Sequence, residues 1–317
     1  MPVILVTAPY MIPIIERFRA IFDRYGLELL VASVQERLEE QDLLQYACKF
    51  DGTICGDDCY TARVLDTCAS RLKVISKWGT GIDSIDRAAA ERLGIQVFRT
   101  PGAFTEPVAD TTLGYMLAFA RRQPWLDRAM KAGVWDKIPG RSLGECTLGV
   151  IGVGTIGKAV IQRSQAFNMR LLGTDIVEVD PQFISSNNLT MISREELLVA
   201  SDFVSLHCDL NPTSHHLINQ RTLGLMKPTA VLINTARGPV INEPDLVDAL
   251  LNHEIAGAAL DVFEIEPLPK TSKLRQLDNV LLAPHNANSS PTAWERVHTN
   301  TIRNLLFGMG FTPPDEL

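Results

Sequence analysis

The chain has 317 residues, about twice the length of a usual domain, so we expect two domains. Its apolar content of 46% and charged content of 21% are typical of a globular protein in solution. A net charge of −7 without a basic run argues against nucleic acid and anionic membranes as main partners, and the apolar stretch from Leu113 to Ala120 is too short to cross a bilayer.

The six cysteines are scattered and predict neither a disulfide framework nor a metal site. Cys55 and Cys59 are the closest pair, and no second pair or nearby histidine completes a zinc pattern. Pro9 and Pro13 interrupt the apolar N-terminal residues and no basic residue precedes them, which favours a strand and a turn over a signal peptide. We therefore expect free thiols and a cytoplasmic protein.

The first hundred residues alternate strand and helix patterns that are joined by short loops. This alternation predicts a parallel sheet with helices on both faces. The predicted strands cover residues 3–6, 27–31, 52–55, 73–76 and 96–98, and the predicted helices cover residues 14–25, 34–46, 62–69 and 87–93.

A break at Thr100-Pro101-Gly102 marks the expected crossing between the two domains. The helix predicted over 106–122 is apolar on several sides, so we expect it to be buried between domains or subunits. A loop with Trp125 and Trp135 follows it.

A glycine cluster then follows a short apolar strand and precedes a helical pattern. In such a dinucleotide-binding turn, Gly152 allows a sharp turn, Gly154 lets the backbone approach a pyrophosphate, and Gly157 lets the helix pack on the sheet. Asp175 ends the next strand at close to the spacing of roughly 20 residues expected for a carboxylate that binds a ribose hydroxyl. An ordinary strand–helix turn is the alternative interpretation.

The strand and helix alternation resumes after this turn and predicts a six-stranded doubly wound sheet. Polar residues stand at the ends of its strands, where open α/β sheets bind their ligands. We therefore expect one crevice lined by Asp175, His207, Thr235, Arg237, the segment from Asp261 to Glu266, and His285.

His285 is the candidate acid/base, because the pKa of an unperturbed imidazole lies near neutrality. Either Glu264 or Glu266 can supply the carboxylate that orients its ring. Arg237 is a candidate for binding a substrate carboxylate through two parallel hydrogen bonds. A loop histidine held by backbone groups and a surface arginine are the alternatives.

Gly79-Thr80-Gly81 follows a strand of the first domain, and its N–H groups can bind an anion, unless it is a simple turn. His215, His216 and His253 have no evident partner and are interpreted as solvated.

Ordered motifs along nearly the whole chain resemble the D-isomer-specific 2-hydroxyacid dehydrogenases, nearest to their phosphoglycerate dehydrogenase-like members. The matching segments are 79–86, 100–102 with 108–110, 148–157, 233–239, 261–267 and 283–285. The resemblance implies an NAD-binding Rossmann domain (residues 100–288) inserted into a flavodoxin-like substrate domain (1–99 plus 289–317), and a homodimer formed through the Rossmann domain.

The resemblance also implies roles for individual residues. Arg237 would bind substrate, His285 would be the general acid/base, and Glu266, not Glu264, would complete the pair. Thr155 and Ile156 would touch the pyrophosphate in the turn formed by Gly152, Gly154 and Gly157. Asp175 would bind the adenine ribose, and Thr235, Ala236 and Asp261 would border the nicotinamide. His207, at a neighbouring strand end, is also expected to belong to the coenzyme site. The N–H groups of Thr80 and Gly81 would hold the substrate carboxylate, with Lys77 as a nearby cation.

Some positions depart from the family pattern. Phe104 replaces a frequent Asn, Cys208-Asp209 replaces a frequent Val-Pro, and Asn286-Ala287-Asn288 replaces Ile-Gly-Gly. Cys55-Gly56-Asp57-Asp58 stands where phosphoglycerate enzymes often carry Arg-Ser, and its two acids would repel a phosphate dianion.

We therefore predict an NAD-dependent oxidoreductase that transfers a hydride between nicotinamide and C2 of a D-2-hydroxy or 2-oxo acid, with D-3-phosphoglycerate or a related small acid as substrate. The alternatives are a phosphite- or formate-type dehydrogenase and an NAD-sensing interaction protein on the same fold. We expect NAD in preference to NADP, because Asp175 would repel a 2′-phosphate.

Overall fold

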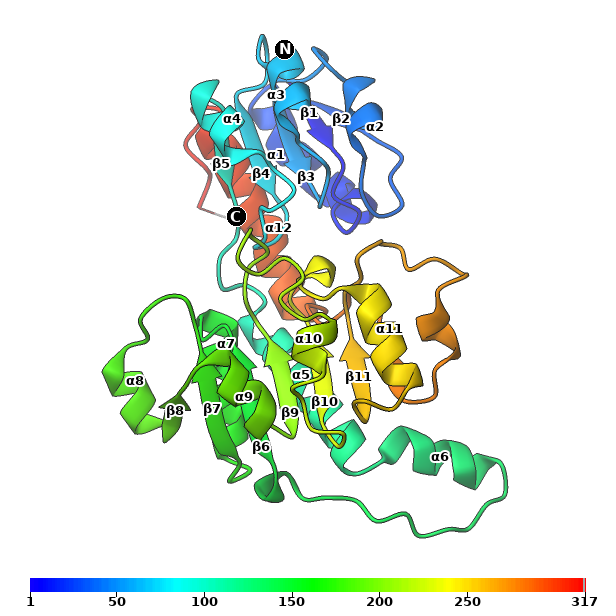
Figure 1. Ribbon diagram of the computed structural model, residues 1–317. Coiled ribbons are helices and arrows are strands. Elements are labelled where there is room, and N and C mark those ends of the chain that lie inside the picture. The colour runs from blue at the N-terminus through cyan, green and yellow to red at the C-terminus, as the bar shows by residue number, and fades with distance from the viewer. Residues whose placement is uncertain (316) are drawn as a thin grey trace. The chain divides into compact units, whose positions relative to one another are not determined.

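The computed structural model describes residues 1–315 and 317, and the chain divides into two compact units (Figure 1). Unit 1 contains Met1–Phe104 and Ser290–Leu317, and unit 2 contains Thr105–Ser289. Each unit has its own parallel sheet, so the predicted α/β class is confirmed. No helix in the described part of the chain combines the length and apolar character of a membrane span.

The sheet of unit 1 has five strands in the order β2-β1-β3-β4-β5, which is the flavodoxin-like order. Because the order reverses between β1 and β3, the loops after these strands flank the expected ligand-binding end of the sheet. The strands are β1 (Val3–Val6), β2 (Glu28–Val31), β3 (Gly52–Cys55), β4 (Val74–Lys77) and β5 (Gln96–Phe98).

Helices flank this sheet, and the last helix of the chain belongs to it. In α12, the carbonyl of Thr301 accepts a hydrogen bond of 2.7 Å from the Ser76 hydroxyl of β4. The predicted helix over 34–46 is shorter than expected, because Glu39 caps a helix that starts only at Glu40. The helices are η1 (Ile12–Phe18), α1 (Arg19–Arg24), α2 (Glu40–Leu44), α3 (Ala62–Cys68), α4 (Arg87–Arg92) and α12 (Pro291–Gly308).

The sheet of unit 2 has seven strands in the order β12-β11-β10-β9-β6-β7-β8. This is the Rossmann order with one added strand, and it reverses between β6 and β9. The predicted count of six was wrong, because β8 is too short to show a periodic pattern. The strands are β6 (Thr147–Ile151), β7 (Arg170–Thr174), β8 (Leu189–Met191), β9 (Phe203–Leu206), β10 (Val231–Asn234), β11 (Gly257–Leu260) and β12 (Val280–Leu282).

Three short helices of unit 2 lie where no helix was predicted: α6 (Gln123–Lys131), α8 (Pro181–Ser186) and α10 (Gln220–Leu223). α6 replaces the predicted loop around Trp125, whose indole N–H donates to the Asp278 carbonyl. The remaining helices are α5 (Thr105–Ala120), η2 (Leu143–Glu145), α7 (Thr155–Gln165), α9 (Arg194–Ala200), η3 (Gly238–Val240), α11 (Glu243–Leu251) and η4 (Lys273–Gln276).

Apolar clusters cover both faces of this sheet. The helix predicted over 106–122 appears as α5, and its Leu113, Met116 and Phe119 lie in the same core cluster as residues of β6 and α7. Unit 2 itself therefore buries much of the apolar surface of α5, and burial of the rest between domains or subunits stays a prediction. All six cysteines are free thiols.

Candidate active site

The turn after β6 is built by backbone groups that approach one another closely. Gly152 has φ +94°, and its N–H donates to the Thr174 carbonyl at 3.0 Å. A Cβ atom at Gly152 would lie 2.6 Å from the backbone nitrogen of Cys208, in the loop after β9. Only glycine fits here, so the β6 turn and the β9 loop meet at the point where the strand order reverses.

The next two glycines of the motif have different surroundings. A Cβ at Gly157 would lie 2.0 Å from the Gly152 carbonyl oxygen, so this glycine lets α7 begin immediately after the turn. A Cβ at Gly154 would meet no atom within 4 Å. Gly154 is also the N-cap of α7, and since glycine has no side chain, no side-chain oxygen of this residue caps the N–H groups of the first turn. The helix start is therefore open, and the N–H groups of Thr155 and Ile156 fit a phosphate group there.

Asp175 lies directly after β7, and both of its carboxylate oxygens are fixed beside this turn. Oδ2 accepts the Val153 N–H at 2.6 Å, and Oδ1 accepts the Val177 N–H at 3.0 Å. The side chain remains partly exposed. A fixed carboxylate in this place is suited to bind a ribose hydroxyl group.

His207 extends from the end of β9, and its backbone N–H donates to Ile151 at 2.8 Å. Its Nε2 lies 2.8 Å from the Ser205 hydroxyl, and its buried Nδ1 has no partner among the described residues. Burial lowers the pKa of His207 to about 3, so the ring is neutral. Burial also raises the pKa of the neighbouring Cys208 to about 11, with the charges of Asp209 and Asp175 adding to this effect.

The turn after β10 carries Arg237 and is held by Asn234, which was not predicted to belong to the site. Asn234 Oδ1 accepts the Ala236 N–H at 3.0 Å, and Asn234 Nδ2 donates to the Arg237 carbonyl at 2.9 Å. Thr235 is almost completely buried, with its Oγ1 3.5 Å from Thr112 Oγ1. An asparagine at a strand end before a tight turn is the signal that could have identified Asn234.

The loop after β11 brings an acid to the candidate acid/base. His285 Nδ1 lies 2.9 Å from Glu266 Oε2, and Glu266 Oε1 accepts the Phe263 N–H at 2.9 Å. Glu264 bonds instead to His216, with 2.6 Å between Oε1 and Nε2. The interpretation of His216 as a solvated residue without a partner was therefore wrong.

Asp261, predicted to border the coenzyme, fixes the turn that carries His285. Its carbonyl accepts the His285 N–H at 2.7 Å, and its carboxylate accepts the N–H groups of Asn286 and Ala287 at 2.8 and 2.9 Å. These bonds hold His285 in a left-handed conformation with φ +50°. Burial raises the pKa of Asp261, which is 1% exposed.

The Arg237 turn and the Glu266 loop also meet at their backbones. A Cβ at Gly238 would lie 1.8 Å from the Phe263 carbonyl oxygen. Arg237 Nη1 donates to the Ala236 carbonyl at 2.9 Å, so part of the guanidinium is held by its own turn. The structure thus brings together the loops that carry Arg237, Glu266 and His285 at one edge of the unit 2 sheet.

In unit 1, the predicted anion-binding turn follows β4. Thr100 holds this turn, because its N–H donates to the Gly79 carbonyl at 2.8 Å and its carbonyl accepts the Thr80 hydroxyl at 2.9 Å. The ammonium group of Lys77 lies 3.9 Å from the position that a Cβ at Gly79 would take. Lys77 is buried and bonds to Asp57 Oδ1 at 2.9 Å.

Asp58 plays a different part from the one expected of it. It was predicted to repel a phosphate together with Asp57, but its side chain is completely buried. Its carboxyl group accepts hydrogen bonds from Thr7 Oγ1, the Leu38 N–H and the Gly56 N–H. Burial raises its pKa. Asp58 is therefore a structural acid that joins the loops after β1, β2 and β3.

Aromatic side chains gather around the residue between Lys77 and Gly79. The ring of Trp78 has its centroid 5.1 Å from that of Tyr10 and 5.6 Å from that of Phe104. Its indole N–H donates to His298 Nδ1 at 2.9 Å, and burial lowers the pKa of His298. The anion turn of unit 1 therefore stands beside a largely apolar wall.

Comparison with known proteins gives a consistent result. Residues 113–287, which lie within unit 2, match the family described as D-isomer specific 2-hydroxyacid dehydrogenase, NAD binding domain. This match covers more than half of the chain.

Three relatives illustrate the similarity. The glyoxylate reductase of Thermofilum pendens is 41% identical over 282 residues, which are 86% of this chain and 83% of that protein. The D-3-phosphoglycerate dehydrogenase of Methanocaldococcus jannaschii is 38% identical over 277 residues, covering 86% of this chain but only 52% of that longer protein. The structure of D-lactate dehydrogenase from Aquifex aeolicus with NAD and lactic acid has a TM-score of 0.87 at 28% identity, covering 97% of this chain and 96% of that one.

Two glycine substitutions should separate coenzyme binding from folding. In Gly154→Ala we expect a melting temperature close to that of the original protein and an NADH dissociation constant at least about tenfold higher, because the added methyl group enters the space meant for phosphate. In Gly157→Ala we expect the melting temperature itself to fall, since the methyl group collides with the Gly152 carbonyl. Thermal melts and NADH fluorescence titrations measure both effects, and unaltered NADH affinity in Gly154→Ala would contradict the assignment of this turn.

Proposed function

The chain belongs to the D-isomer specific 2-hydroxyacid dehydrogenase family, and from this premise we propose that it reduces a small, non-phosphorylated 2-oxo acid such as glyoxylate to the D-2-hydroxy acid. Membership makes it an NAD-dependent oxidoreductase. The observation that carries the proposed reaction is the contact of 2.9 Å between His285 Nδ1 and Glu266 Oε2, beside the loop that presents Arg237.

We assign coenzyme binding to unit 2, which also carries Arg237, Glu266 and His285. The turn from Gly152 to Gly157 would hold the pyrophosphate, and Asp175 the adenine ribose. Thr235, Ala236 and the segment around Asp261 would adjoin the nicotinamide, with His207 at the β6–β9 junction. When bound, the nicotinamide supplies the hydride for C2 of the oxo acid or accepts it in the reverse reaction.

The protein side chains would supply the remaining chemistry. The Arg237 guanidinium would bind the carboxylate of the oxo acid and polarise its carbonyl group. His285 would donate the proton from Nε2 to the carbonyl oxygen as this oxygen becomes a hydroxyl group. Glu266 would fix the ring through Nδ1 and favour the protonated imidazole that reduction requires. In unit 1, the N–H groups of Thr80 and Gly81 are candidates for binding a carboxylate.

The charges of unit 1 favour a substrate without a phosphate group. Lys77 places a cation at the anion turn, and Asp57 compensates this charge at a distance of 2.9 Å. A dianion would therefore meet no net positive charge from this pair. The aromatic wall of Tyr10, Trp78 and Phe104 adds apolar surface in the same place. The family relationship to D-3-phosphoglycerate dehydrogenases thus does not extend, in our proposal, to their substrate.

Asp175 supports a preference for NAD over NADP. Its carboxylate is fixed by two backbone N–H groups, so it cannot easily turn away from a bound ribose. A 2′-phosphate placed beside it would be repelled by the negative charge.

We also propose a homodimer. The arm of unit 2 that includes α6 and the segment after it extends from the sheet (Figure 1). It exposes apolar side chains that a second copy of the chain would cover, namely Met130, Val134, Trp135 and Ile138.

A panel of 2-oxo acids with NADH tests the proposed substrate class. We expect turnover with glyoxylate or hydroxypyruvate and a much lower kcat/KM with phosphohydroxypyruvate. In Asp57→Asn, the ratio of kcat/KM for phosphohydroxypyruvate to kcat/KM for hydroxypyruvate should rise about tenfold, because Lys77 loses its compensating charge. Asp66→Asn, which removes an exposed acid paired with Arg92 in the same unit, is the control. A preference of the original protein for phosphohydroxypyruvate would contradict the proposal.

His285→Ala should lower kcat for oxo acid reduction by roughly 10²–10⁴-fold, because the proton donor is lost. NADH binding, measured by fluorescence titration, should stay within about twofold. His253→Ala serves as a matched control, since His253 is an exposed histidine of the same unit that also has a positive φ, of 54°. The assignment of the acid/base fails if His285→Ala and His253→Ala have the same activity.

Asp175→Asn tests the coenzyme preference by removing the negative charge, while one side-chain oxygen remains to accept a backbone N–H. The original protein should bind NADH at least about a hundredfold more tightly than NADPH, and the substitution should narrow this ratio by about tenfold, because the amide does not repel the 2′-phosphate. Asp180→Asn, in the exposed cap of α8, controls for the change in net charge. Tighter binding of NADPH by the original protein would disprove the preference.

A further inference from the structure

A second histidine–carboxylate pair lies on the same loop as the candidate dyad. Glu264 and Glu266 are two residues apart, yet their carboxylates reach different histidines. Glu266 bonds to His285, whereas Glu264 Oε1 lies 2.6 Å from His216 Nε2. Both members of this second pair are partly buried, with 35% of the His216 and 25% of the Glu264 side chain exposed. Screening by water is therefore incomplete at this contact.

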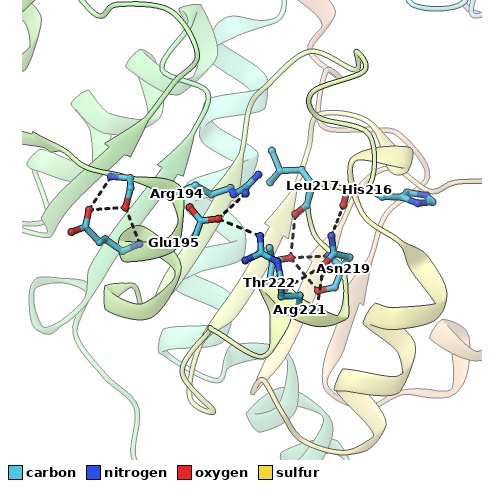
Figure 2. Close-up of polar contacts among 9 residues, drawn as sticks. Arg194, Glu195, His216, Leu217, Asn219, Arg221 and Thr222 are labelled. Carbon is cyan, nitrogen blue, oxygen red and sulfur yellow. Dashed lines mark hydrogen bonds and ion pairs between the residues drawn. The ribbon is translucent and has the colours of Figure 1, made fainter.

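The backbone of His216 is fixed by neighbours on both sides. Its N–H donates to the Pro239 carbonyl at 2.9 Å, and its carbonyl accepts Asn219 Nδ2 at 2.8 Å, a contact drawn in Figure 2. Its φ of +48° lies in the left-handed region, which is uncommon for residues other than glycine. The ring also stacks on that of His215, with 4.0 Å between the centroids.

The segment that follows His216 is equally well anchored. Asn219 caps α10 through Oδ1, which accepts the N–H groups of Arg221 and Thr222. The Thr222 hydroxyl donates to the Leu217 carbonyl at 3.1 Å (Figure 2). Glu195 of α9 bonds to both Arg194 and Arg221. His216 is thus presented by a segment that is tied to two helices.

The loop that receives this contact carries the acid of the candidate dyad. Ile265, between the two glutamates, is 64% exposed and gives the loop little apolar packing. Phe263 packs its backbone against Gly238, on the side of Arg237. The His216 contact fixes the loop one residue further along, next to the residues that lead to Glu266.

We propose that His216 and Glu264 form a positioning pair that fixes the loop 261–267, so that the Glu266 carboxylate stays in contact with His285. The pair links the loops after β9, β10 and β11, because His216 bonds to Pro239 through its backbone and to Glu264 through its ring. The inference rests on the proposed function, in which Glu266 serves His285. Two ionisable groups lie next to the pair. His215 stacks on His216, and the Glu243 carboxyl group accepts a hydrogen bond from the backbone of Glu264 and is repelled by its carboxylate.

The test compares Glu264→Ala, Glu264→Gln and His216→Ala in the full-length protein with glyoxylate and NADH. We expect Glu264→Ala and His216→Ala each to lower kcat about tenfold, with NADH affinity unchanged. Glu264→Gln should retain most activity, because its amide oxygen can still accept a hydrogen bond from His216. The double variant should be no slower than either single variant, since both remove one interaction.

Two further readouts distinguish positioning from general stabilisation. A displaced Glu266 retains the proton on His285 less well, so the alkaline limb of the kcat/KM profile for reduction should move to lower pH in Glu264→Ala. Thermal melts show whether folding is affected, and Glu254→Ala and His253→Ala are matched controls at exposed positions of unit 2.

The inference is overturned if the activity of Glu264→Ala equals that of Glu254→Ala, or if activity falls only in proportion to lost folded protein with an unaltered pH profile. Additive losses in the double variant would also contradict it, because the two residues would then act independently. Absence of turnover with every 2-oxo acid in the original protein would instead contradict the proposed function. In that case a nuclear magnetic resonance titration of His285 in Glu264→Ala still tests whether the pair holds Glu266 in place.

Discussion

The unit 2 site depends on close contacts between backbone segments, which are possible only because the residue at each contact is a glycine. At Gly152 the turn after β6 meets the loop after β9, and at Gly238 the turn after β10 meets the loop after β11. Since the strands are parallel, their carboxyl ends already lie at one edge of the sheet. The glycines reduce the remaining separation to van der Waals contact. At the same edge, His285 and Glu266, 19 residues apart, and His216 and Glu264, 48 residues apart, lie within hydrogen-bond distance of each other.

Carboxyl groups with similar sequence surroundings serve different purposes because their burial differs. Asp261 and Asp58 are buried, accept several N–H or O–H groups and have raised pKa values, so they act as internal anchors for loops. Glu266 and Asp175 are more exposed and place an oxygen next to a histidine or beside the helix start. The buried acids determine where the turns lie, and in our proposal Glu266 serves His285 and Asp175 binds the ribose.

Much of this could be predicted from the sequence, because the glycine motif, the strand-end residues and the spacing of the βα units are local patterns. The fold class and the family were predicted in this way and are confirmed. The roles of Asp57 and Asp58 could not be separated, because both lie in the irregular loop after β3 and nothing local shows which side chain turns into the core. The contact of His216 with Glu264 joins residues that lie 48 positions apart, so no local pattern indicates it. β8, with three residues, was missed because it is too short for a periodic signal.

At His285, the groups that fix the turn are different from the imidazole ring that is the candidate acid/base. The bonds that fix the turn run from the backbone N–H groups of residues 285 to 287 to Asp261, and none of them uses the imidazole ring. Asp261 therefore fixes the backbone at position 285, and with it the point from which the side chain of residue 285 extends. We expect a substitution at position 285 to leave these backbone bonds in place, as long as the buried acid is kept. Loss of the Asp261 side chain, in contrast, would displace the His285 imidazole, although, of the residues that the structure describes, the Asp261 carboxylate bonds only to the backbone of Asn286 and Ala287.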